Sequence, residues 1–149
     1  MQEDNYYKSN NITNIPNLRL SPKTKLLYFQ YRGLIEITEN ALQALSDSIC
    51  KDLGLVCIDI TFAGIRPHKR LNKFTTNEIY GKHGSGKSWS SIRIYKLTAK
   101  RRNLVSAKSA IDTLIHEICH DIDINILQLQ SIHTKGFYSR IKHLHRAMY

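Results

Sequence analysis

The chain has 149 residues, with 22 Lys and Arg against 12 Asp and Glu, and therefore a formal net charge of +10. This length predicts one domain with a single hydrophobic core. No stretch approaches the ~18 continuous apolar residues that a membrane span needs, and the polar N-terminus does not resemble a signal peptide. We therefore expect a cytoplasmic protein without a membrane partner.

The positive charge is concentrated in one block. Residues 66–102 hold eleven Lys and Arg and one acid, so the remaining residues, with eleven bases and eleven acids, are neutral. Such clustering favours binding to a polyanion, and we interpret it as a contact surface for DNA. A solvated basic surface is the alternative. The predicted nucleic-acid-binding residues are Arg66, Lys69, Arg70, Lys100, Arg101 and Arg102.

The predicted elements begin after a polar segment. Residues 1–22 are rich in Asn, Ser and Tyr and show no periodicity, which predicts a flexible or extended lead-in before a domain over 23–149. Thr38 can cap a helix and Gly54 can end one, and apolar residues recur between them at helical spacing. A helix is therefore predicted over 39–53.

The middle of the chain has the pattern of strands. Apolar residues alternate over 55–62, and β-branched and aromatic residues are frequent in 74–81 and 91–97. These segments predict a three-stranded sheet, with a basic loop over 64–73.

The apolar period changes to that of a helix after residue 105. The pattern predicts a long helix from Ser106 to about residue 127 or 129, and then a last helix over roughly 135–147. The expected fold class is α+β, with an N-terminal helix, a three-stranded sheet, the long helix and a C-terminal helix.

A glycine-rich segment, GKHGSGKS at 81–88, matches the phosphate-loop pattern G-x-x-x-x-G-K-[ST]. In that pattern backbone amides and a lysine hold nucleotide phosphates, and the loop must join a strand to a helix. Here the residues after Ser88 alternate as in a strand. We therefore interpret the segment as a hairpin loop, with a nucleotide site as the alternative.

A second motif, HEICH at 116–120, lies within the predicted long helix. Residues four apart are neighbours on a helix, so His116 and His120 can bind one metal ion while Glu117 reaches a water there. The histidines project from the side opposite the apolar residues, which favours a metal site over core packing. Two core histidines are the alternative.

A catalytic zinc usually has three protein ligands and one open position. Asp123 lies on the same side of the helix but about 10.5 Å along the axis from His116, too far to share an ion. His133, at a turn after the helix, is the best third ligand, and Asp123 is expected to orient a ligand from outside. His68 and His83 are interpreted as loop residues.

The motif HEICH, followed by HTKGF with its histidine at 133, resembles the H-E-x-x-H and H-x-x-x-F signature of the SprT-like zinc metallopeptidases. That group contains Spartan and the WLM proteases of DNA–protein crosslink repair. The preceding IYGKHGSGKSWSSIRIYKL is similar to the family's Gly/Tyr hairpin. The resemblance covers roughly residues 40–147. It implies a compact zincin-like domain with Zn²⁺ on His116, His120 and His133, and Glu117 as the general base.

The sequence thus predicts a zinc-dependent metalloprotease that hydrolyses peptide bonds, including those of DNA-associated proteins. Strand 91–97 is expected to be an edge strand that holds an extended substrate. Thr134 departs from the family, because many members have Gly at this place. The alternative is a basic nucleic-acid-binding module whose metal is structural or absent, and a structural zinc would be closed by four protein ligands.

Overall fold

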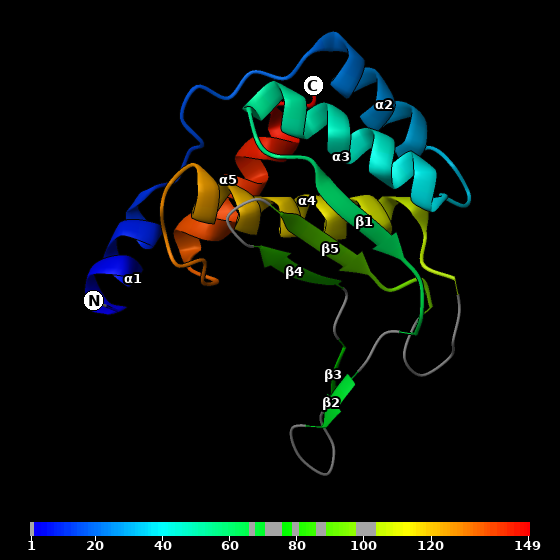
Figure 1. The fold of residues 1–149 in the computed structure, drawn as a ribbon. Helices are drawn as coiled ribbons and strands as arrows, with labels where there is room; N and C mark the ends of the chain where they lie inside the picture. The colour runs from blue at the N-terminus through cyan, green and yellow to red at the C-terminus, as the bar shows by residue number, and fades with distance from the viewer. Residues whose placement is uncertain (1, 66–67, 71–75, 79–80, 86–88, 98–103) are drawn as a thin grey trace.

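A computed structural model describes most of the chain. The described residues are 2–65, 68–70, 76–78, 81–85, 89–97 and 104–149, and for 2–3, 68–70, 76–78, 81–82 and 85 only the backbone is described. They form an α+β fold of five helices, a three-stranded mixed sheet and a two-stranded ribbon, which confirms the predicted class (Figure 1). In order, the elements are α1 (Gln2–Asn11), α2 (Pro22–Arg32), α3 (Glu39–Leu53), β1 (Ile58–Phe62), β2 (His68–Arg70), β3 (Thr76–Glu78), β4 (Gly81–Ser85), β5 (Ser90–Ile94), α4 (Ala107–Asn125) and α5 (Lys135–Arg146).

The main sheet has the strand order β1-β5-β4, with β1 parallel and β4 antiparallel to β5. Ile92 and Ile94 of β5 are buried beside Ile58 and Ile60 of β1. Strand β5 is therefore central and hydrogen-bonded on both sides, while β4 lies at an edge of the described sheet. This corrects the prediction that residues 91–97 form an edge strand.

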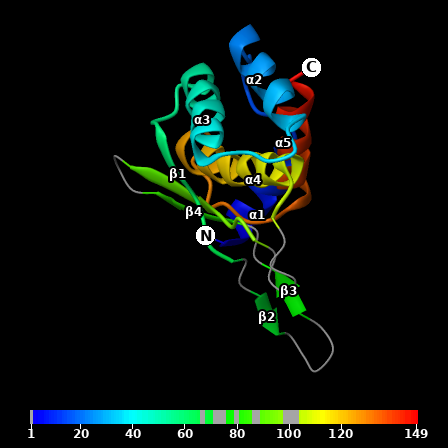
Figure 2. The same ribbon diagram turned by 90° about the vertical axis from the view of Figure 1, so that its right-hand side faces the viewer.

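The prediction that the segment 74–81 forms a strand of the main sheet is also wrong. The segment contains β3, which pairs with β2, and β2 lies inside the segment predicted as a basic loop. This ribbon projects from the rest of the fold in both views (Figures 1 and 2). The third strand of the sheet is β4, whose residues GKHGS have no apolar alternation that would reveal a strand.

Helix α3 has the predicted bounds, and local chemistry accounts for them. The Thr38 hydroxyl accepts a hydrogen bond from the Ala41 backbone N–H at 3.1 Å, which caps the first turn. At the other end Gly54 has φ +71°, the left-handed conformation that glycine adopts without a Cβ clash. Leu42, Leu45 and Ile49 of this helix are fully buried.

The N-terminal segment differs from its prediction, because residues 2–11 form helix α1 and helix α2 starts at Pro22. The Ser21 hydroxyl caps α2 by accepting from the Thr24 N–H at 3.2 Å. Helix α1 is polar and has no apolar stripe, but it packs against α5. A contact so distant in sequence leaves no local pattern, and this explains why the prediction failed.

Helix α4 runs through the middle of the fold and packs against α2, α3, α5, β4 and β5 (Figure 2). It starts where predicted, with Ser106 as its N-cap, and it ends at Asn125, two residues before 127, the nearer of the two predicted ends. The large aliphatic residues that are fully buried on it are Ile111, Leu114, Ile115, Ile118 and Ile122. Because neighbours surround this helix, its buried carboxyl groups need partners from other elements.

Helix α5 lies within one residue of its predicted bounds. Thr134 caps it by accepting from the Phe137 N–H at 3.0 Å, and Phe137 and Leu144 are fully buried. Among the described residues, no helix is both long and apolar enough to span a membrane.

Candidate metal centre

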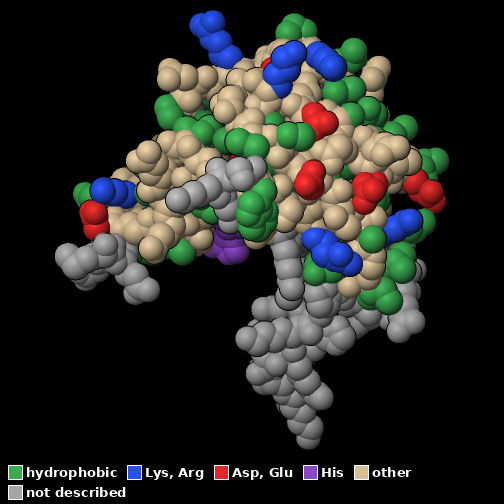
Figure 3. All heavy atoms as spheres, viewed as in Figure 1, with side chains coloured by type: hydrophobic (Ala, Val, Ile, Leu, Met, Phe, Trp, Pro, Cys, Tyr) green, Lys and Arg blue, Asp and Glu red, His purple; other side chains and the backbone are tan. Residues whose placement is uncertain are grey.

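Three histidines meet beside α4, as the sequence predicts. His116 and His120 are one turn apart on α4, and His133 lies in the loop between α4 and α5. The Nε2 atom of His133 is 3.2 Å from Nε2 of His116 and 3.1 Å from Nε2 of His120. Histidine side chains reach the surface near the lower edge of the body in Figure 3.

The spacing of these nitrogens fits a metal ion. Three ligands at Zn–N bonds near 2.0–2.1 Å in tetrahedral geometry lie about 3.3 Å apart. Burial is the main cause that lowers the pKa of His116 to about 4 and that of His120 to about 3, and neighbouring histidines add to it. Both imidazoles are therefore neutral ligands at pH 7, and the three residues can hold a metal ion.

An aromatic side chain supports all three imidazoles. The buried ring of Phe137 stacks on His120, with ring centroids 4.5 Å apart, and lies 5.1 Å from His116 and 5.2 Å from His133. Tyr138 lies on the open side, 47 % exposed, with its ring 5.9 Å from that of His133. The histidines thus have a fixed apolar wall on one side and solvent access on another.

Glu117 occupies a buried position next to His116. Its carboxyl group is 7 % exposed, and burial raises its pKa to about 7, although the charge of His83 acts in the opposite direction. A carboxyl group with this pKa can both accept and donate a proton near neutral pH, as a general base must.

Asp123 holds His120 indirectly, through the hydroxyl group of Ser131. Nδ1 of His120 is 2.6 Å from the Ser131 hydroxyl, which donates to Oδ2 of Asp123 at 2.8 Å. Arg140 binds the same carboxylate through Nε at 2.9 Å and Nη2 at 3.0 Å, and both residues are fully buried. The sequence analysis missed Ser131 and Arg140, because neither stands at a motif position.

His83 is not a loop residue, which corrects the prediction for it. It lies on β4 with a side chain 6 % exposed, and its Nε2 is 2.8 Å from Oδ1 of Asp121. The Ser90 hydroxyl donates to the same oxygen at 2.6 Å. Burial alone would raise the pKa of Asp121, but the hydrogen bonds from His83 and Ser90 outweigh it and lower the pKa. This cluster attaches the edge strand to the helix that carries the histidines.

The glycine-rich segment begins in one strand and is followed by another. Its first five residues are strand β4, which pairs antiparallel with β5, the next element described. The hairpin interpretation is confirmed, but residues 81–85 are a strand rather than a loop. Residues 86–88 lie outside the described residues. Among the described elements, the one that follows β4 is the strand β5 and not a helix, so the context of a phosphate loop is not met.

Most of the predicted nucleic-acid contacts fall outside the described part of the chain. Arg66, Lys100, Arg101 and Arg102 are not among the described residues, and only the backbone of Lys69 and Arg70 is described, in β2. The coloured Lys and Arg side chains in Figure 3 lie at several separate places on that face. The basic block therefore stays a prediction from charge.

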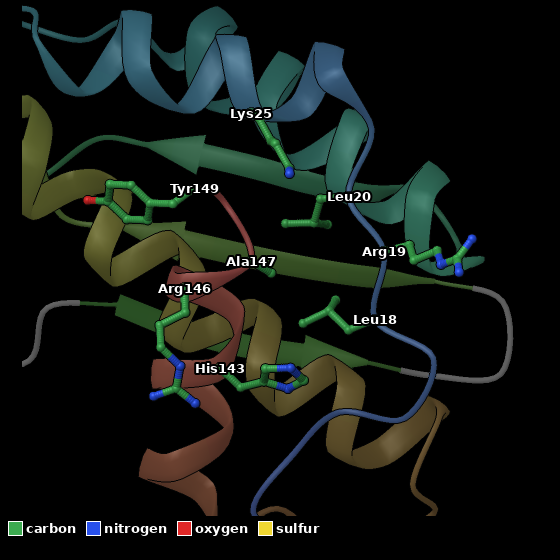
Figure 4. A pocket seen from close by; sticks show the side chains of 8 residues that line it. All are labelled: Leu18, Arg19, Leu20, Lys25, His143, Arg146, Ala147 and Tyr149. Atoms are coloured by element: carbon green, nitrogen blue, oxygen red, sulfur yellow. The ribbon is translucent and has the colours of Figure 1, made fainter.

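A separate cavity of about 480 Å³ lies between residues 18–25 and the end of α5 (Figure 4). It is lined by Leu18, Arg19, Leu20, Lys25, His143, Arg146, Ala147 and Tyr149. The side chains of Arg19 and Arg146 point in different directions rather than at a common point. Cations near the C-terminal end of a helix complement its carbonyl groups, which accounts for the basic residues on α5, and we assign no ligand to this cavity.

No family model, no curated protein and no solved structure matches the chain. The SprT-like resemblance therefore stays a prediction from the sequence motifs, and the function has to be argued from the centre itself.

Proposed function

We propose that the chain is a zinc-dependent metallopeptidase with a zincin-like fold. The observation that supports this most directly is the convergence of His116, His120 and His133, with the buried residue Glu117 following His116 on the same helix. A structural zinc normally has four protein ligands, whereas a catalytic zinc keeps one position open. The described residues bring three ligands together here, and this favours the catalytic class over a binding module with a structural metal.

The three histidines would hold Zn²⁺, which when bound lowers the pKa of a water toward about 7 and polarises a carbonyl group. Glu117 accepts a proton from the attacking water as its oxygen adds to the peptide carbonyl carbon. The C–N bond then breaks, and Glu117 gives the proton to the leaving amine nitrogen. The pKa of about 7 suits both steps, because the carboxylate is populated at neutral pH and its conjugate acid is still a good donor.

The substrate would be a peptide in extended form. Strand β4 lies at the sheet edge and packs against α4, so an added strand would run along a strand that packs against the helix with His116 and His120. This place replaces the strand 91–97, which is paired on both sides. His83, through Asp121, fixes β4 to the helix that presents Glu117.

Glu117→Gln is expected to abolish peptide hydrolysis while zinc content and thermal stability are retained, because Glu is a base and not a ligand in this motif. We would measure metal content, melting temperature and cleavage of an unfolded protein substrate. Asp112→Asn is the matched control, since Asp112 lies on the same helix with a side chain 42 % exposed. A Glu117→Gln variant that cleaves at the wild-type rate, or a zinc-loaded wild type without peptidase activity, would refute the proposal.

The charge distribution favours proteins on DNA as the substrates. The excess of basic residues in 66–102 would attract phosphates and bring a DNA-associated protein to the centre. The rival function, a nucleic-acid-binding module, keeps the DNA contact but predicts no hydrolysis, so the Glu117→Gln experiment separates the two.

A further inference from the structure

We propose that helix α1 is an integral part of the metal centre, because it fixes the residues that orient His120 and the loop that carries His133. This inference rests on the proposed metal site and names Ser131 and Arg140 as positioning residues. It goes beyond the motif, because every histidine ligand lies more than 100 positions after α1 in the sequence.

The hydrogen bonds at His120 have a fixed direction. The Asp123 carboxylate, paired with Arg140, only accepts, so the single hydrogen of the Ser131 hydroxyl goes to Asp123. The oxygen of Ser131 must then accept from Nδ1–H of His120. This leaves a lone pair on Nε2 of His120, the atom that faces His133. Ser131 therefore selects the tautomer that can bind a metal.

The position of Asp123 depends in turn on α1. Arg140 uses all five of its N–H donors, and Asp123 accepts only two of them. Nη1 donates to the backbone carbonyls of Ser9 at 2.7 Å and Ile12 at 2.5 Å, and Nη2 donates to the Ser9 hydroxyl at 3.1 Å. Ser9 lies in α1 and Ile12 directly follows it, so α1 supplies two of these three acceptors and positions the third. Because Arg140 is fully buried, displacement of α1 would leave donors unpaired and free the guanidinium to turn away from Asp123.

Helix α1 also binds the loop directly, on both sides of residues 131–133. The Asn5 side chain donates to the Gln130 carbonyl and accepts from the Gln130 N–H, both at 2.8 Å. The Ser9 and Thr134 hydroxyls are hydrogen-bonded at 2.9 Å. The short segment with Ser131 and His133 is thus tied to α1 at each end.

Gly136 allows a test that leaves the three histidines and their hydrogen-bonding side chains unchanged. A Cβ on Gly136 would overlap the carbonyl oxygen of Ser9 and lie 2.8 Å from that of Asn10, so Gly136→Ala should push α1 away from α5. Gly33→Ala is the matched control, because a Cβ there has ordinary contacts at 3.6 and 3.7 Å. We expect Gly136→Ala to weaken zinc binding about 10–100-fold, the usual effect of losing outer-shell support, and Gly33→Ala to leave it within about twofold.

Zinc affinity would be measured on the full chain by competition with a chelator, and displacement of α1 by hydrogen exchange over residues 2–11. If Gly136→Ala does not fold, Asn5→Ala replaces it, since it removes both bonds to Gln130 from a partly exposed site. A variant that has lost the protection of α1 yet binds zinc as tightly as the wild type would overturn the proposal.

Ser131 gives a second readout that does not depend on metal. Nitrogen NMR of the metal-free chain should show Nδ1–H on His120 in the wild type and in Ser131→Thr, but a mixture of tautomers in Ser131→Ala. Ser131→Ala should also weaken zinc binding about 10–100-fold, with recovery in Ser131→Thr. An unchanged tautomer and affinity in Ser131→Ala would exclude the positioning role.

The outcomes for the two proposals can be told apart. A wild type that binds zinc but hydrolyses no peptide refutes the proposed function, while the α1 variants still decide the present inference by zinc affinity. A wild type that binds no zinc refutes both.

Discussion

Two segments of this chain match functional motifs letter for letter, but they lie in different kinds of secondary structure. Residues 116–120 lie on helix α4, where the four-residue spacing brings His116 and His120 together and His133 joins them. Residues 81–88 begin as the edge strand β4, and the next element described is the strand β5.

The difference shows that a motif acts through the element that carries it. Two histidines at i and i+4 converge because of helix geometry itself. A phosphate loop needs the amides and dipole of a following helix, and letters alone do not supply them. Among the side chains described in 81–88, that of His83 contacts Asp121, and His83 stands at a position that the phosphate-loop pattern leaves unspecified.

The most direct way to break this comparison is to remove the third ligand. His133→Ala is expected to weaken zinc binding by more than about 100-fold, beyond the loss that outer-shell changes cause. His145→Ala, a histidine of α5 that contacts Tyr28, is the control. Metal analysis and chelator competition would measure both. Full metal retention in His133→Ala would show that His133 is not a ligand. The motif at 116–120 would then lack its third ligand, as the motif at 81–88 lacks its helix.

The basic block around the glycine-rich segment offers a second test. Replacing Arg66, Lys69, Arg70, Lys100, Arg101 and Arg102 with Ser or Gln should weaken DNA binding and flatten its salt dependence. If three of them contact phosphates, the loss is roughly 10²-fold at low salt. Zinc content and cleavage of a short free peptide should be unchanged. A wild type without salt-sensitive binding to single- or double-stranded DNA would show that the charge is only a solvated surface.

The pH dependence of stability provides a third test, made on the zinc-free chain. His116 and His120 have folded-state pKa values of about 4 and about 3, below the unfolded value of 6.5, so their contribution is lost as the pH falls below 6.5. Glu117 has a folded-state pKa of about 7, above its unfolded value of 4.5, so its contribution is lost as the pH rises from 4.5 to 7.

Between pH 4.5 and 6.5 the unfolded chain binds two protons at the histidines and the folded chain binds one at Glu117. Stability from these groups should therefore rise with pH to about 6.5 and then decline. Melting curves should show a fall of about 2–4 °C from pH 6.5 to 5, the effect of ~1 kcal/mol in a domain of this size. Glu117→Gln should make this fall steeper. A flat profile in both proteins would contradict the buried, neutral state of the histidines.

The sequence predicted those parts of the fold and site that depend on local pattern. The bounds of α3 followed from Thr38 and Gly54, and the cluster of three histidines followed from the spacing on α4 and the turn at His133. Long-range contacts were not predictable in this way. Helix α1 is polar, and a contact that holds it comes from Arg140, which donates a hydrogen bond to the Ser9 carbonyl. Strand β4 has no apolar alternation and is a strand because it pairs with β5.

The smallest expected effect is at Lys87, the residue most diagnostic of the phosphate-loop pattern. A phosphate-binding lysine needs a cradle of amides at a helix start, and the strand β5 follows this segment instead. Lys87→Ala should therefore leave zinc content and peptide hydrolysis within about twofold of the wild type, because the context of a phosphate site is not met here. Calorimetry with ATP and Mg²⁺ would complete the test. Nucleotide binding that disappears in Lys87→Ala would mean that residues 81–88 bind phosphates without a helix after the loop. The contrast with residues 116–120 would then no longer hold.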